Sequence, residues 1–113
     1  MKIKYANDKL EEIFTDYNKM KKRISFEWVR SIKKTIDRLE SADKFGDFLK
    51  LGLGKPERLK GSSKQIIYSV HVDQNVRMIF GLNATNDTVL ICSELEIKGV
   101  CDYHGSKENW YLS

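Results

Sequence analysis

The stretch YSVHVDQNVRMIF, residues 68–80, decides the fold because two alternating apolar–polar segments flank a short polar turn. Such alternation is typical of half-buried β-strands, and the turn residues favour a hairpin. A three-residue loop, DQN, pairs Val70 with Met78 and keeps the apolar side chains on one face, whereas a two-residue loop would mix the faces. The three-residue register therefore predicts that His71 and Arg77 are cross-strand neighbours on the other face.

The chain before the hairpin has a helical pattern. Apolar residues recur at spacings of three and four over residues 10–24 and again over residues 29–39, which predicts two amphipathic helices. Asn7 or Asp8 is the candidate N-cap of the first helix, and Ser25 is that of the second. Because the turn between them is very short, the helices are predicted to form an antiparallel hairpin.

Shorter elements surround these two units. Residues 2–5 are predicted to form an edge strand, and residues 43–51 a short helical turn that ends before Pro56. Beyond the hairpin, a third strand is predicted to start at residue 88 and to continue pairing through Ile97. Gly99 marks a bulge or a bend after it.

Together these elements predict a single α+β domain of 113 residues. Its helical half is 1–42, its sheet half is 56–104, and its C-terminal tail is 105–113. The predicted architecture is an N-terminal two-helix hairpin packed on a small, mainly antiparallel, twisted β-sheet. Three roles are open for the aromatic tail, which can cover a site, pack on the core or bind a partner.

Positive charge is in modest excess and is clustered. The 20 Lys and Arg residues against 16 Asp and Glu give a net charge of +4, which permits an anionic partner without requiring one. The clustering is typical of a nucleic-acid-binding surface, although solvated helix faces have the same pattern. The clusters are Lys19 to Arg23, then Arg30, Lys33, Lys34 and Arg38 at helical spacing, then Lys50 to Lys64.

Several classes of protein are excluded. Cys92 and Cys101 form neither a CxxC pair nor a dense framework, so no metal site, cofactor or disulfide scaffold is predicted. The N-terminus has no apolar signal segment, and no apolar run approaches the ~20 residues of a membrane span. The expected location is the cytoplasm, with no membrane partner.

Four short motifs occur in order along the chain: Leu59-Lys60-Gly61, Tyr68-Ser69-Val70, VRMIF at residues 76–80, and Asp102-Tyr103-His104. Together they resemble the pattern of HigB-like toxins of the RelE/ParE superfamily, in which two helices also precede a small sheet. The resemblance implies a RelE-like fold and a metal-independent endoribonuclease that cleaves messenger RNA in the A site of the 70S ribosome. It also implies a HigA-like helix-turn-helix antitoxin that forms a hetero-oligomer with the toxin.

The resemblance implies a catalytic set of four residues. Arg77 would stabilise the charge that develops when a ribose 2′-OH attacks the adjacent phosphate. His104 would do acid–base work, since its ordinary pKa of ~6.5 permits both protonation states near neutrality. Asp102 would orient or charge-stabilise His104, and Tyr103 would stack on a base or donate a proton. From its mid-strand position alone, Arg77 would instead be a surface residue paired with an acid.

An RNA-binding set is implied around these residues. It comprises Arg58, Lys60, Lys64, Tyr68 and His71. Lys60 would contact phosphate as a point charge, and the alternative for it is a solvated loop lysine. His71 lies beside Arg77 in the predicted register, and the alternative for it is an ordinary exposed histidine on a strand.

One departure from the family pattern bears on the mechanism. Some HigB-like members have a histidine three residues before the lysine of the KG motif, where this chain has Glu57. A carboxylate at that position, or His71 nearby, would have to replace it. Two other functions stay open: a ParE-like inhibitor of DNA gyrase, and a non-catalytic binding module that acts only with its antitoxin partner.

Overall fold

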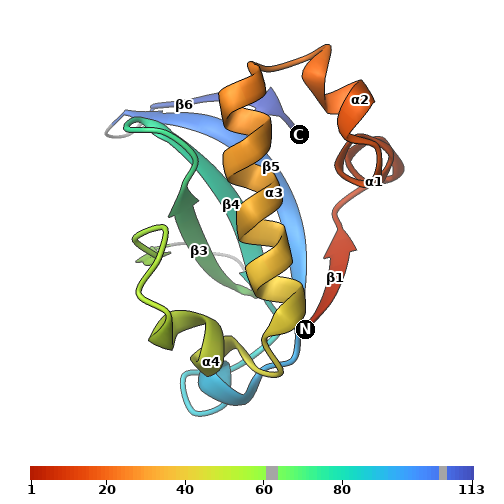
Figure 1. The fold of residues 1–113 in the computed structure, drawn as a ribbon. Helices are drawn as coiled ribbons and strands as arrows, with labels where there is room; N and C mark the ends of the chain where they lie inside the picture. The colour runs from red at the N-terminus through yellow and green to blue at the C-terminus, as the bar shows by residue number, and fades with distance from the viewer. Residues whose placement is uncertain (61–63, 105–106) are drawn as a thin grey trace.

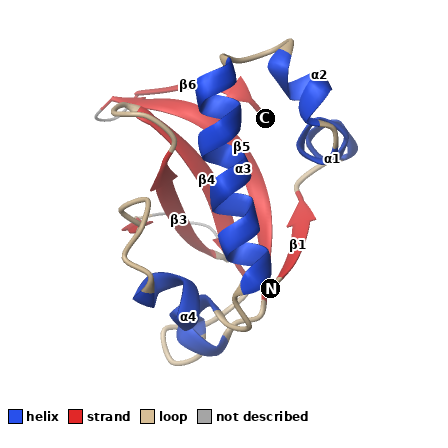
Figure 2. Ribbon diagram, in the orientation of Figure 1, coloured by secondary structure: helices blue, strands red, loops and turns tan. Residues whose placement is uncertain are grey.

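The structure is a computed structural model that describes residues 1–60, 64–104 and 107–113, with the backbone alone described for residues 103, 104, 107 and 108. A sheet is crossed on one face by a long helix, α3 (Figure 1). Figure 2 shows this helix in front of the strands and the shorter helices beside it and below it. The described residues therefore confirm the α+β class.

The sheet has the strand order β1-β5-β4-β3-β2, and β6 also pairs with β5. The strands are β1 (Lys2–Tyr5), β2 (Glu57–Leu59), β3 (Ile66–His71), β4 (Val76–Leu82), β5 (Glu94–His104) and β6 (Lys107–Leu112). β1 runs parallel to β5, and the other pairings among the described strands are antiparallel. The sheet is thus mainly antiparallel, and its first strand is the predicted edge strand.

The hairpin of β3 and β4 has the predicted register. His71 pairs with Arg77, and Val70 pairs with Met78. Both Val70 and Met78 are fully buried in the core. The three-residue loop is confirmed because only that register sends the apolar side chains of both strands to the same face.

The prediction of one helix over residues 10–24 is wrong, because the chain forms α1 (Asp8–Thr15) and α2 (Tyr17–Lys21). Asp16 between them is extended, with φ −137° and ψ 94°. Its carboxylate accepts a hydrogen bond from the backbone N–H of Asn18 at 3.1 Å and so caps α2. The apolar spacing does not reveal this break, because both short helices turn their apolar side chains towards one core.

The second predicted helix is α3 (Phe26–Ser41), and Ser25 caps it by accepting a hydrogen bond from the Trp28 N–H at 3.4 Å. Figure 1 shows α1 along its own axis while α3 runs across the view, so the two helices cross instead of lying antiparallel. The interruption at Asp16 accounts for this difference, since it redirects the chain before α3 begins. In the part of the chain that the structure describes, no helix combines the length and the apolar character needed to span a membrane.

The predicted short helix lies at α4 (Phe45–Lys50). After it the backbone turns sharply, with φ of 65° at Gly52 and 76° at Gly54. Glycine adopts this left-handed conformation without steric cost. Lys55 follows with φ 45°, which is uncommon for a residue with a side chain. These residues bring the chain from α4 into β2 and place Lys55 at the sheet edge.

The last part of the sheet differs from the prediction. Residues Val89–Ile91 form a 3₁₀ helix, η1, so the strand predicted from residue 88 is wrong, and β5 begins at Glu94. Gly99 does mark an irregularity, because the β4–β5 register shifts there. A Cβ at Gly99 would lie 2.1 Å from the Leu112 carbonyl oxygen, so only glycine permits this approach. The tail therefore packs on the sheet as β6.

Candidate functional site

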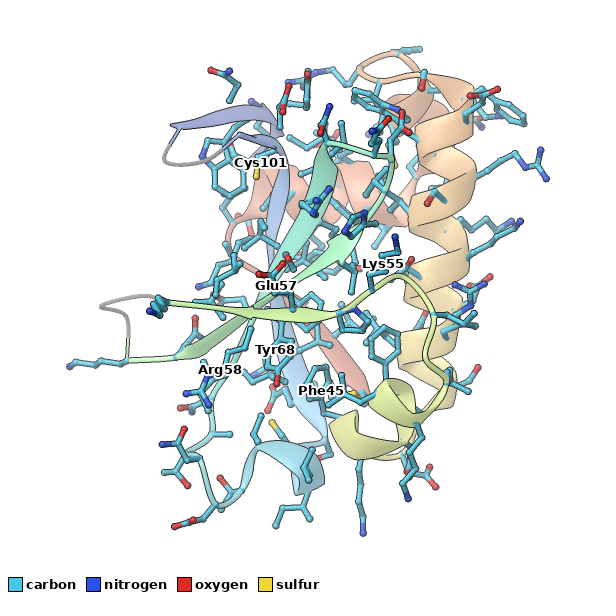
Figure 3. All side chains as sticks on the ribbon, turned by 90° about the vertical axis from the view of Figure 1, so that its left-hand side faces the viewer. Phe45, Lys55, Glu57, Arg58, Tyr68 and Cys101 are labelled. Atoms are coloured by element: carbon cyan, nitrogen blue, oxygen red, sulfur yellow. The ribbon has the colours of Figure 1, made fainter. Side chains whose placement is uncertain are left out.

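Four charged or titratable side chains lie at the turn end of the β3–β4 hairpin and in the segment that leads into β2. Here they are called the His71 cluster: Lys55, Glu57, His71 and Arg77. His71 is directly opposite Arg77, and Glu57 is opposite Ser69 on the neighbouring strand. Figure 3 shows Glu57 above β2 and Lys55 farther along the same segment, nearer to α3. The charges of Lys55, Glu57 and Arg77 all act on the imidazole of His71.

Arg77 is held by the turn of its own hairpin. Its Nη1 donates to the carbonyl oxygen of Gln74 at 2.9 Å and to that of Asp73 at 3.4 Å. The carboxylate of Asp73 in turn accepts from Trp28 Nε1 at 3.0 Å, which ties the turn to α3. Among the described residues, Nε and Nη2 of Arg77 have no protein acceptor, so two donors of a preorganised guanidinium remain available for an anion.

His71 is half-buried, and its backbone N–H donates to the Gly54 carbonyl oxygen at 2.8 Å. Burial lowers the pKa of its imidazole, the positive charges of Arg77 and Lys55 lower it further, and Glu57 opposes them. The ordinary pKa of histidine is ~6.5, so the imidazole of His71 is neutral at pH 7. A neutral imidazole beside a guanidinium is suited to accept a proton.

The pKa of His71 provides a test of this arrangement. We expect His71 to titrate below ~6.5 in an NMR pH titration of the imidazole, and its pKa to rise in Arg77→Gln because a positive charge is removed. Glu57→Gln should lower it. Because the pKa of His71 is lower in the folded state than in the unfolded state, the free energy of unfolding should decrease as the pH falls from the unfolded-state pKa towards the folded-state pKa. An unchanged pKa in both variants would show that the three side chains do not interact.

A second feature, the basic groove, lies at the other end of β3. Arg58, Lys60 and Lys64 line it together with Thr85 and Asn86. Its volume is ≈ 680 Å³. The structure thus brings together three of the residues that the sequence predicted to bind RNA. Five residue-to-residue steps along β3 lead from its first residue, Ile66 at the groove, to His71, a distance of about 17 Å.

Tyr68 does not belong to either feature. Its ring lies on the helix-covered side, with its centroid 4.7 Å from that of Phe45 and 6.3 Å from that of Phe80. Figure 3 shows Tyr68 beside Phe45. The structure therefore places Tyr68 among core aromatic residues and not with the RNA-binding lysines, because residues 68 and 71 differ by an odd number and point to opposite faces of β3.

Asp102 is also on the other face from Arg77. It pairs with Val76, whose side chain is buried in the core, whereas the residue that pairs with Arg77 is the buried Cys101. The structure therefore does not bring Asp102 together with Arg77, because one position along β5 reverses the face. Tyr103 and His104 belong to β5 by their backbone and pair with β6. Their predicted catalytic side chains lie outside the described residues.

Sequence reasoning identified His71, Arg77 and Glu57 but missed Lys55. The available signal was a lysine between Gly54 and Pro56, in a stretch where glycine and proline fix the backbone. Only the pairing of β2 with β3 shows that this loop ends beside His71.

The described residues contain no group of three or more His, Cys, Asp or Glu side chains that could hold a metal ion. Within the described residues, neither Cys92 nor Cys101 is in a disulfide. In comparisons with protein-family models, with curated proteins and with solved structures, nothing matches this chain.

Proposed function

We propose that this protein is an endoribonuclease that cleaves RNA without a metal, and that the His71 cluster is its active centre. One observation carries the proposal: the hairpin register puts an imidazole directly opposite a guanidinium, with a carboxylate on the next strand. Cleavage at a ribose 2′-OH needs a proton acceptor and a cation at the phosphate. His71 and Arg77 have those properties.

The reaction assigns a step to each group. The 2′-oxygen attacks the adjacent phosphorus while neutral His71 takes the 2′-OH proton, and Glu57 stabilises the imidazolium that forms. Arg77 Nε and Nη2 donate to the phosphate oxygens as negative charge develops. The bond from phosphorus to the 5′-oxygen breaks, which leaves a 2′,3′-cyclic phosphate. A proton donor to the 5′-oxygen completes the step, and the family resemblance assigns that role to His104.

The basic groove would hold the RNA strand on one side of the cleaved bond. Its three cations, Arg58, Lys60 and Lys64, could each contact one of several successive phosphates. Contacts between cationic side chains and phosphates supply most of the affinity of proteins for nucleic acids. Since the groove lies about 17 Å from His71 along β3, it would bind phosphates several nucleotides away from the scissile one.

The biological role we propose is that of a RelE-like, HigB-like toxin of a type II toxin–antitoxin system. It would act in the cytoplasm on messenger RNA in the 70S ribosome. A HigA-like helix-turn-helix antitoxin would neutralise it in a hetero-oligomer. These statements depend on the motif resemblance, and the clustered positive charge is compatible with them.

Induction of the protein without an antitoxin tests this function. We expect translation to stop, and we expect primer extension on a reporter messenger to show new 5′ ends inside the coding sequence. The reason is that a ribonuclease removes the template itself. The double variant His71→Ala/Arg77→Ala, produced at the same level, is the control and should give neither effect. Growth arrest with DNA-damage signalling and intact messenger would contradict the proposal and favour a gyrase inhibitor. Absence of any arrest would favour a binding module.

A further inference from the structure

A second basic groove, called here the α3 groove, lies between α3 and the loop that carries Gly54. Its volume is ≈ 460 Å³. One wall is a row of cations, Arg30, Lys34 and Arg38, and His71 is part of its lining. Figure 3 shows the loop with Lys55 running alongside α3. This groove therefore leads from the surface of the helix to the His71 cluster.

The cations of the α3 groove form a straight row. They are spaced by four residues, so they lie on one face of the helix and extend over about 12 Å of its axis. Arg30 and Lys34 are exposed, and Arg38 is half-buried. The ion pairs formed by described residues involve Lys4, Lys19 and Lys98 and none of the three groove cations. Glu27 is the one acidic residue among the described lining residues.

This row does not belong to the buried face of α3. The buried face of α3 consists of other residues: Val29, Ile32, Thr35, Ile36 and Leu39. The neighbouring lysine, Lys33, points elsewhere, because its Nζ lies over the ring of Tyr17 at 5.7 Å from the centroid. Three cations that form no ion pair with another described residue, aligned on one wall of a groove, leave positive charge where an anion would fit.

We propose that the α3 groove binds the phosphate backbone of the RNA strand on the opposite side of the cleaved bond from the basic groove. This inference rests on the proposed function. A linear row of cations matches a polyanion better than a single small anion. Its described lining contains no large apolar side chain, only charged and polar residues and Gly54. Protein interfaces have apolar cores, whereas nucleic-acid interfaces are more polar and more positively charged, so RNA fits this groove better than an acidic protein segment.

His71 belongs to both the α3 groove and the His71 cluster. It lines the α3 groove, and it pairs with Arg77 in the β3–β4 hairpin. A strand that runs along α3 would therefore reach His71.

The experiment measures binding of a single-stranded RNA in which 2′-deoxy nucleotides prevent cleavage, by fluorescence anisotropy at several salt concentrations. The test variant is Arg30→Gln/Lys34→Gln/Arg38→Gln. The matched control is Lys9→Gln/Lys22→Gln/Lys33→Gln, which removes three exposed positive charges from other surfaces. The smaller pair Lys34→Gln and Lys33→Gln compares two adjacent lysines of one helix. Circular dichroism checks that all variants fold equally.

We expect the test variant to lose affinity by at least roughly tenfold at low salt, and its slope of log K against log salt to flatten by about 2, since each phosphate contact on a single strand contributes about 0.7. The control should keep the wild-type slope. Equal affinity and slope in the test variant and the control would overturn the inference while leaving the ribonuclease intact. If polyglutamate binds the groove and RNA does not, the groove serves an acidic protein segment and the inference is overturned.

Cleavage assays on the unmodified RNA separate the two proposals. If wild type cleaves and the test variant binds normally, the groove inference alone fails. If wild type never cleaves but binds RNA through Arg30, Lys34 and Arg38, the ribonuclease proposal fails and the groove stands as an RNA site.

Discussion

His71→Ala is expected to lower the rate of RNA cleavage by roughly 10²–10⁴-fold, the usual contribution of a general base. In the proposed mechanism the imidazole takes the proton from the attacking 2′-OH. Single-turnover cleavage of a defined RNA, with the enzyme in excess, measures this step apart from product release.

The dependence of the rate on pH distinguishes catalysis from a structural role. In the proposed mechanism neutral His71 is the active form, and burial together with Arg77 and Lys55 lowers its pKa. Wild-type activity should therefore stay high at pH 7 and fall as pH drops through this lowered pKa, below ~6.5. His71→Ala should lose this acidic limb as well as rate. His104→Ala provides the comparison. If this variant loses as much rate but keeps the acidic limb of the pH profile, His104 is assigned to proton donation. Full activity of His71→Ala would contradict its role as the base.

Arg77→Ala is expected to lower the same rate by roughly 10²–10³-fold, the scale for loss of one donor that acts mainly in the transition state. Its guanidinium is already oriented by the carbonyl oxygens of Asp73 and Gln74, so it loses little freedom when the phosphate becomes more negative. Arg77→Lys should recover only part of the activity, because an ammonium group cannot donate two parallel hydrogen bonds.

Arg58→Ala provides the comparison for Arg77→Ala. Arg58 lines the basic groove, and Figure 3 shows it pointing away from Glu57 on β2. Its loss should raise KM with little change in kcat, since it contributes equally to the ground state and the transition state. Arg77→Ala should change kcat instead. Thermal unfolding must show that the hairpin turn survives in Arg77→Ala. If Arg77→Ala changes only KM, as Arg58→Ala is expected to do, Arg77 is an RNA-binding residue and not a catalytic one.

Local patterns in the sequence predict the hairpin and α3 but not every boundary. The alternation around the DQN loop specifies the pairing of His71 with Arg77, because any other register would bury polar residues. The apolar spacing of α3 and its N-cap, Ser25, are likewise visible within one continuous segment, so they predict this helix without knowledge of the rest of the fold. The break at Asp16 escapes such reasoning, since the apolar side chains on both sides of it face the same core. η1 escapes it as well, because a short apolar run is compatible with either a strand or a helical turn.

The α+β class, the central hairpin and the proximity of His71 to Arg77 can therefore be predicted from the chain's local patterns, since periodicity and turn length are local properties. Which distant residues join them depends on the packing of the whole fold. Pairing of β2 with β3 adds Glu57 and Lys55, and the register of β5 against β4 turns Asp102 away from Arg77. The path of α3 beside the Gly54 loop creates the α3 groove. The physical reason is that strand pairing and helix packing depend on how the whole core fills space, which no single segment encodes.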